Sequence, residues 1–408
     1  MDEEDVAVTR YPSLKEVATL AGVSFQTASK VLNGGSVRVA PATAERIEAA
    51  ARELGYSPNS LARSLVRQKT MTIGLVAGSL SDPALAEFVV GAERRARAYG
   101  HSVLVGNLAD DDDDGPALVR SLVERRVDGI IAAAPQLEED SEVAELLRRY
   151  GPAVSLHHVP GGGVPLVGSN HREVGRLAAD HLLSGGRRVL GTVSGPFRRR
   201  VVRSRLHGFE EAQREAGLEV AEDLVIEADW TPAGAARAVR LLFERVPALD
   251  ALFVHSDVMA VGVLDALASL GRAVPDDVAV VSCDDLPFAA FLAPPLTTVR
   301  IPFHDTGAAC VELLLRSTGG EEVALEPLLL PVDLVVRDSS GPRWRAERPS
   351  VAAVGQAARG ASRGRTVARG APTDSRPAGS GPAGSEPLDR ARGASRPPTG
   401  PETRGSGM

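Results

Sequence analysis

The sequence predicts a small all-α head, a large α/β body built on two doubly wound parallel sheets, and a C-terminal segment without a packed core. Three observations predict this order. Short amphipathic helical patterns with capping signals occur up to Tyr56, whereas from Thr72 short apolar runs alternate with helical stretches. After Ser339 the chain is mostly Ala, Gly, Pro, Ser and Arg, which cannot bury enough apolar surface to fold.

The size and the charge of the chain support a division into domains. A chain of 408 residues exceeds one ordinary core. Residues 10–69 carry nine Lys or Arg against four Asp or Glu, whereas residues 70–340 carry 25 against 40. A basic module ahead of an acidic body is typical of a nucleic-acid-binding head on a separate domain.

Composition also indicates the cellular setting. The chain has only two cysteines, Cys283 and Cys310, opens on acidic rather than basic residues, and contains no apolar run long enough to cross a membrane. We therefore expect a cytoplasmic protein in a reducing compartment.

The head begins with two short helices joined by a tight turn. Ser13 and Glu16 form a capping box that opens the first helix, which ends at Gly22. Ser24 caps a second helix that runs to about Leu32. This is the helix-turn-helix arrangement.

Two further helical segments follow. A third helix is predicted from Pro41 to Leu54, with proline at its first position and Gly55 after its end. Residues Ser57–Val66 form a capped segment that is too short to be a stable helix in water, so we expect it to fold only against a partner.

The body alternates predicted strands and helices, which is the pattern of parallel sheets with helices on both faces. The predicted strands are TIGLVA (72–77), SVLVG (102–106), GIIAAA (129–134), PAVSL (152–156), RVLGTV (188–193), ALFVH (251–255) and VAVVS (278–282). The predicted helices cover residues 84–99, 116–126, 172–184, 203–216, 232–245 and 258–270.

Three motifs resemble the lac repressor family of bacterial transcription regulators: LKEVATLAGVSFQTASKVLNG (14–34), AARELGYSPNSLARSL (50–65) and VSCDD with PPLTTVR (281–285, 294–300). The resemblance covers about residues 12–338. It implies a repressor that binds double-stranded operator DNA as a homodimer. It also implies a body like the periplasmic sugar-binding proteins, with a small effector, a carbohydrate or its derivative, between two subdomains crossed by three strands.

Helical patterns and resemblance together predict five segments. They are a flexible N-terminus (1–11), a helix-turn-helix DNA-binding domain (12–56), a hinge helix and linker (57–70), an effector-binding and dimerisation domain (71–338), and a disordered tail (339–408). The tail is basic, with 12 Arg against five acidic residues from 341 onward. It makes weak, salt-sensitive DNA contacts or has no role.

By the resemblance, the second helix lies in the DNA major groove and faces it with Ser24, Phe25, Gln26, Thr27, Ser29, Lys30 and Asn33. Gln26 can form two hydrogen bonds to an adenine edge, and Lys30 can donate to guanine or to a phosphate. In the hinge, Leu65 matches a leucine that enters a base step from the minor groove, and Ala62 matches a small residue that permits close approach.

Two of these residues depart from the family pattern. Phe25 lacks the hydroxyl of the tyrosine in the lac repressor, and Lys30 replaces the usual arginine. The sequence therefore predicts DNA binding without naming the operator.

For the effector, the resemblance places Arg205 and Asp284 on opposite sides of the ligand and Trp230 as an aromatic platform. It adds Ser256, where asparagine is common, and His157, where Asp or another polar residue is usual. The alternative is that Arg205 and Asp284 form a structural ion pair. Neither the effector, nor the target genes, nor the direction of its effect on DNA binding follows from the sequence.

Other patterns favour simpler interpretations. The acidic run Asp110–Gly115 lacks the glutamate that completes a calcium loop, and His157 and His158 lack a third zinc ligand. The basic run Phe197–Arg205 allows an anionic effector or is a basic surface beside one functional arginine. No catalytic, metal or cofactor motif is present. The alternatives to a repressor are an activator, a sugar-transport component and a sugar-modifying enzyme.

Overall fold

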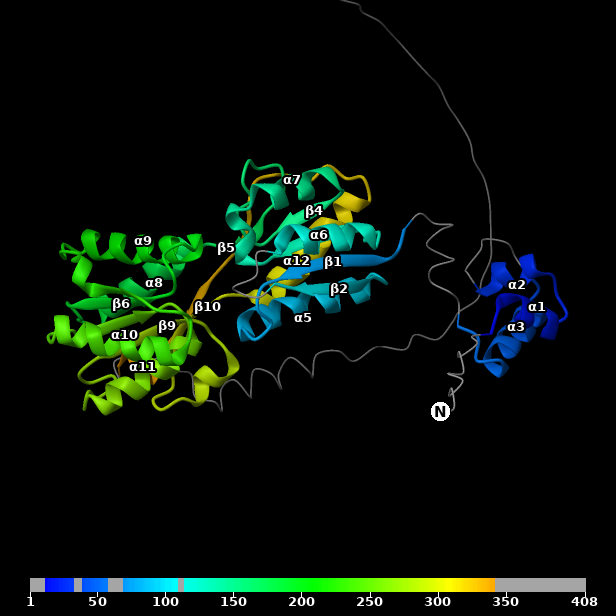
Figure 1. Cartoon of the computed structure of the whole chain (residues 1–408). Helices are drawn as coiled ribbons and strands as arrows, with labels where there is room; N and C mark the ends of the chain where they lie inside the picture. Colours follow the sequence, from blue (N-terminus) through cyan, green and yellow to red (C-terminus); the bar gives the residue numbers. More distant parts are fainter. Residues whose placement is uncertain (1–11, 33–38, 58–68, 109–113, 342–408) are drawn as a thin grey trace, which may run out of the picture. The chain divides into compact units, whose positions relative to one another are not determined.

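The computed structural model describes residues 12–32, 39–57, 69–108 and 114–341, which form a helical head and an α/β body (Figure 1). The predicted hinge helix and almost all of the predicted tail lie outside the described residues, as does the acidic run before Asp114. Within the described ranges, no helix is long and apolar enough to span a membrane.

The head is built of α1 (Leu14–Leu20), α2 (Phe25–Leu32) and α3 (Pro41–Glu53). The predicted capping box forms, since Ser13 Oγ accepts the backbone N–H of Glu16 and the Glu16 carboxylate accepts the backbone N–H of Ser13 at 2.6 Å. Val17, Ala28 and Ile47, one from each helix, are fully buried in a shared core. The predicted helix-turn-helix is confirmed.

The N-terminal half of the body is a parallel sheet with the order β2-β1-β3-β4. Its strands are β1 (Thr72–Ala77), β2 (Ser102–Asn107), β3 (Gly129–Ala133) and β4 (Ala153–Ser155). A bridge between Ser155 and Leu166 extends this sheet to the pair β5 (Val167–Ser169) and β11 (Leu328–Leu330). On one face pack α5 (Pro83–Ala98) and α12 (Phe303–Thr318), and on the other α6 (Gly115–Glu124) and α7 (Ser141–Arg149).

The C-terminal half is a six-stranded sheet with the order β12-β10-β9-β8-β6-β7, in which only β12 is antiparallel. Its strands are β6 (Leu190–Ser194), β7 (Val225–Glu227), β8 (Ala251–Val254), β9 (Ala279–Asp284), β10 (Thr297–Arg300) and β12 (Asp333–Val335). The helices are α8 (His171–Ser184) and α9 (Arg200–Glu215) on one face, and α10 (Pro232–Arg245) and α11 (Asp257–Ser269) on the other.

The chain passes between the two halves at three places, residues 169–171, 300–303 and 330–333. Because α12 belongs to the N-terminal half although it follows β10, neither half is continuous in sequence. The predicted pair of doubly wound sheets, crossed three times, is confirmed.

The body begins where the predicted hinge ends, and Asp128 holds that junction. Its carboxylate accepts the backbone N–H groups of Thr70 at 2.7 Å and Met71 at 2.8 Å. Met71 has a positive φ of 53°, and the hydrogen bonds from Thr70 and Met71 to the Asp128 carboxylate help to maintain this conformation. Asp128 therefore fixes the direction in which the chain enters β1.

Close contact between α5 and α12 requires a glycine at position 91. A Cβ on Gly91 would lie 1.9 Å from the backbone carbonyl oxygen of His304. We expect Gly91→Ala to force the helices apart and to lower the free energy of unfolding by about 2 kcal/mol or more, as overpacking does in cores. Urea unfolding measures this, and Gly168→Ala is the control, because its Cβ would meet its nearest atom at 3.5 Å. Equal stability of the two variants would contradict the account of this contact.

Candidate DNA-binding helix and effector site

Helix α2 presents a polar face opposite its contact with the head core. Ala28 points inward and is fully buried. Among the predicted DNA-facing residues, the exposed ones are Ser24, Phe25, Gln26 and Lys30, and the half-buried ones are Thr27 and Ser29. The other three predicted contacts, Asn33, Ala62 and Leu65, lie outside the described residues.

The polar residues at the start of α2 and along it divide into two groups. Ser24 Oγ accepts the backbone N–H of Thr27 at 3.1 Å and lies 2.8 Å from the Thr27 hydroxyl, so this pair fixes the start of the helix. Gln26 and Lys30 are four residues apart and therefore share one exposed face. Among the side chains of this helix, the amide of Gln26 and the ammonium group of Lys30 are best suited to hydrogen-bond the edges of bases.

Arg205 is at the centre of the candidate effector site, on α9, and is only 5% exposed. Its Nε donates to His171 Nδ1 at 3.3 Å, and Nη1 donates to the backbone carbonyl of His255. Nη2 lies 3.8 Å from Oδ1 of Asp284. One guanidinium thus joins the start of α8 to the carboxyl ends of β8 and β9.

Asp284, the last residue of β9, is also buried and has a positive φ of 115°. Burial raises the pKa of Asp284 to about 8, although the Arg205 guanidinium acts in the opposite direction. The Cys283 thiol lies 3.4 Å from Oδ1 of Asp284. Burial thus favours the neutral form of this carboxyl group, which can both donate to and accept from a ligand hydroxyl.

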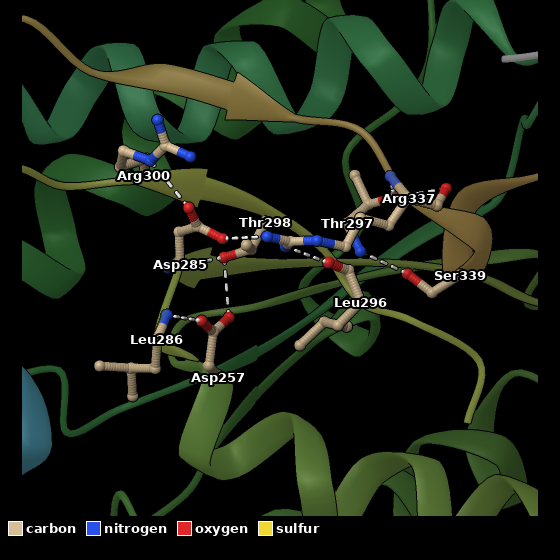
Figure 2. A network of polar contacts seen from close by, with 9 residues as sticks. All are labelled: Asp257, Asp285, Leu286, Leu296, Thr297, Thr298, Arg300, Arg337 and Ser339. Atoms are coloured by element: carbon tan, nitrogen blue, oxygen red, sulfur yellow. Dashed lines mark hydrogen bonds and ion pairs between the residues drawn. The ribbon is translucent and has the colours of Figure 1, made fainter. Parts of the chain in front are cut away.

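The backbone after Asp284 is held by the polar network in Figure 2. Asp285 accepts from Arg337 at 2.6 Å and from Arg300 at 2.7 Å. Asp257, buried at the start of α11, accepts the backbone N–H that follows Asp285 at 2.8 Å. Because β10, α11 and the segment after β12 all contribute, this network sets the strained conformation that Asp284 adopts.

The segment after β12 is itself anchored by buried hydroxyl groups. Ser339 Oγ donates to the carbonyl of Val280 at 2.7 Å and accepts the backbone N–H of Thr297 at 2.8 Å. The Ser340 hydroxyl lies 2.8 Å from both the Thr297 hydroxyl and His181 Nε2.

His181 should make stability depend on pH. Burial lowers the pKa of His181 from 6.5 to about 4, so between these values the unfolded chain binds more protons than the folded one. The free energy of unfolding should therefore fall as pH drops from about 6.5 toward 4. Urea unfolding across this range should show a smaller fall for His181→Gln than for the wild-type protein. The same fall in both proteins would exclude His181 as the cause.

The other three predicted effector residues lie in different surroundings. Ser256 caps α11, with its Oγ accepting the backbone N–H of Val258 at 3.2 Å, and also hydrogen-bonds Asp284. Trp230 follows β7 with a positive φ of 64°, and its ring packs against Gly195, where a Cβ would lie 2.2 Å from it. The structure thus brings Arg205, Asp284 and Ser256 together, whereas Trp230 covers the end of β6.

His157 comes from the N-terminal half of the body, where its Nδ1 lies 3.3 Å from Oε1 of Glu138. Glu138 is 4% exposed and belongs to the 3-10 turn Pro135–Glu139 that follows β3. The backbone N–H of Arg200, the first residue of α9, donates to Oε2 of Glu138 at 3.3 Å. Glu138, which the motifs did not indicate, therefore connects the two halves.

Two histidines complete the site and were also missed from the sequence. His255 is fully buried, its ring lies tilted against that of Phe253 with the ring centroids 4.8 Å apart, and neither ring nitrogen has a hydrogen-bond partner among the described residues. Burial and the nearby Arg205 lower the pKa of both His171 and His255, so both rings are neutral. A polar residue at the end of the apolar run ALFVH was the available signal, because carboxyl ends of parallel strands gather at one edge.

Within the basic run Phe197–Arg205, the Arg203 side chain is engaged by the backbone of the run itself. Arg203 donates to the carbonyls of Phe197 at 2.8 Å and Arg198 at 2.7 Å, so its guanidinium closes the loop before α9. In the part of the chain that the structure describes, no group of three or more His, Cys, Asp or Glu residues could hold a metal ion.

Comparison with known proteins agrees with this two-part organisation. The family profile "Bacterial regulatory proteins, lacI family" matches residues 13–59, and the "Periplasmic binding protein-like domain" matches residues 179–340. The ribose operon repressor of Escherichia coli K12 is 32% identical over 331 residues, which are 80% of this chain and 99% of that protein. The transcriptional repressor PurR of Aliivibrio salmonicida is 32% identical over 312 residues, 74% of this chain and 91% of that protein.

Solved structures extend the similarity. A lac repressor dimer bound to operator and the anti-inducer ONPF is 29% identical with a TM-score of 0.76, over 82% of this chain and all of that one. A complex of the regulator CelR with cellobiose is 33% identical with a TM-score of 0.62, over 81% of this chain and all of that one. Matches of this extent to repressors exclude the alternatives of a transport component and a sugar-modifying enzyme. The chain belongs to the lacI family of bacterial regulatory proteins and is a DNA-binding transcriptional repressor.

Proposed function

We propose that this repressor acts in the cytoplasm as a homodimer and that a saccharide bound between the halves of its body controls its affinity for operator DNA. The helix α2 enters the major groove, with Gln26 and Lys30 contacting bases or phosphates. The remaining DNA contacts in the proposal are Ser24, Phe25, Thr27, Ser29, Asn33, Ala62 and Leu65. The dimer bound to operator in the similar lac repressor structure supports this arrangement.

The observation that carries the effector proposal is the buried Arg205–Asp284 pair at the carboxyl edge of the second sheet. An arginine that donates, and a carboxyl group whose neutral form burial favours and which then donates and accepts, match the hydroxyl groups of a sugar. Trp230 offers an apolar surface for a sugar ring, and Ser256 and His157 add polar contacts. The cellobiose complex of CelR and the name of the ribose operon repressor also favour a saccharide.

Control of DNA binding follows from the three crossings between the halves. A ligand that binds one angle between them better than another shifts the population toward that angle. Since the head is linked to β1 through the junction that Asp128 holds, this change reaches the predicted hinge. A coupling free energy of about 1 to 3 kcal/mol is sufficient for such a switch.

A thermal-shift panel of neutral sugars and sugar phosphates on the purified protein tests the effector proposal. A ligand that binds only the folded state raises the apparent stability, by about 2.7 kcal/mol at a hundredfold excess over Kd. We expect one or more sugars to raise the unfolding temperature of the wild-type protein. Failure of every sugar would reject the saccharide and would leave the DNA-binding function standing.

A further inference from the structure

Glu138 provides an unusual cap for α9. The N-cap residue of this helix is Arg199, whose side chain does not cap it. The acceptor comes instead from the other half of the body, where Oε2 of Glu138 accepts the N–H of Arg200. The first-turn amides of a helix, with the helix dipole behind them, favour a negatively charged group. Here that group is the carboxylate of the protein itself.

The surroundings keep Glu138 ionised. Burial raises the pKa of Glu138, but the hydrogen bond and charge of His157, the N–H of Arg200 and the charge of Arg199 outweigh it and leave the pKa below its ordinary value. With 4% of its surface exposed, the carboxylate is held by groups from both halves. A second anion at this place would have to displace it.

The approach to Glu138 is also acidic. A cavity of about 490 Å³ adjoins it and is lined by both halves of the body. Its charged lining residues are Glu138, Glu139, Asp140, Glu142, Arg198 and Arg199. Glu142 is paired with Arg120, and the remaining three acidic residues still outnumber the two arginines, so a phosphate or carboxylate on a ligand would meet like charges on its way to α9.

We propose that Glu138 determines the charge class of the effector: by occupying the N-terminus of α9 it admits neutral saccharides and excludes sugar phosphates and sugar acids. This inference rests on the proposed function, because it names the class of ligand for the same site. The basic run Phe197–Arg205 contains the start of α9, so in this proposal the anion that the run faces is the Glu138 carboxylate of the protein itself.

Inorganic phosphate is the probe that tests Glu138 without knowledge of the effector. Glu138→Gln keeps an oxygen that can accept the N–H of Arg200 but removes the charge. Glu139→Gln is the matched control, since it removes the same charge from an exposed neighbour on the same cavity. Isothermal titration should show phosphate binding at least about tenfold tighter to Glu138→Gln than to the wild type or the control, as expected when a helix N-terminus and cations lose their internal anion.

Two results would overturn the inference. One is equal phosphate affinity of Glu138→Gln and Glu139→Gln when both unfold at temperatures close to that of the wild type. The other needs no variant: tighter binding of ribose 5-phosphate than of ribose, or of a sugar phosphate than of its parent sugar, to the wild-type protein. If no sugar binds but the phosphate titration gives the expected difference, the saccharide proposal fails and the role of Glu138 stands.

Discussion

Replacement of Arg205 by methionine should weaken effector binding by about a hundredfold or more, because it leaves buried polar partners without their cation. The guanidinium donates to His171 and to the carbonyl of His255 and lies 3.8 Å from Asp284. Methionine fills a similar volume, so the loss would be of charge and hydrogen bonds rather than of packing. Titration with a sugar that stabilises the wild type measures the effect.

The control for Arg205→Met is Arg214→Met, which changes an exposed arginine nine residues later on the same helix, where it pairs with Glu210. We expect this control to bind the sugar within about twofold of the wild type, as surface substitutions usually leave energies nearly unchanged. The interpretation of Arg205 as a mere structural ion pair predicts something different. In that case Arg205→Met would lower the unfolding temperature while the folded protein kept its sugar affinity.

Replacement of Gln26 by alanine should weaken specific operator binding by about 10- to 100-fold, which corresponds to the loss of one bidentate base contact worth about 1 to 3 kcal/mol. Binding to unrelated duplexes and the dependence of binding on salt should change little, because Gln26 carries no charge. Fluorescence anisotropy with a duplex that the protein has selected from a random pool gives both quantities.

Two further variants serve as comparisons for Gln26→Ala. Lys30→Gln should lower the slope of log affinity against log salt by about one if Lys30 contacts a phosphate. Thr19→Ala, on the exposed side of α1, should retain wild-type affinity for the selected duplex. Wild-type affinity of Gln26→Ala would show that α2 does not contact the bases through this residue.

Local signals explain why the head could be predicted almost completely from the sequence. The capping box at Ser13, the glycine turn and the apolar spacing of α1 to α3 act over three or four residues, and the structure follows them. The positions of α2 side chains relative to DNA depend on a partner, so they stay predictions.

In the body, local sequence signals did not predict every helix and strand. Helices α7 and α12 were not among the predicted helices. In α12 the structure shows that a glycine is needed at position 307, because a Cβ there would lie 2.1 Å from the carbonyl oxygen of Phe88 on α5. The strands β5, β7, β10, β11 and β12 were also missed, because each has only three or four residues, too few for periodicity, and is defined by its pairing with a neighbouring strand.

The candidate effector site was predicted in part through the resemblance. Arg205, Asp284 and Ser256 are near each other as expected from family positions, although their roles are still proposals. No motif indicated Glu138, whose contact with Arg200 joins residues 62 positions apart in the sequence. His255 ends the apolar run ALFVH, but its carbonyl meets Arg205, which is 50 positions away in the sequence. Such contacts become visible only when both halves are folded.

The account as a whole depends on coupling between the body and the head. The most direct test is the affinity of the purified protein for its selected duplex, measured with and without a saturating concentration of a sugar that stabilises it. We expect the sugar to change this affinity by about 5- to 150-fold, the range of typical allosteric coupling, and to leave the affinity of Arg205→Met unchanged. A sugar that binds the body yet leaves the DNA affinity of the wild-type protein unaltered would contradict the account.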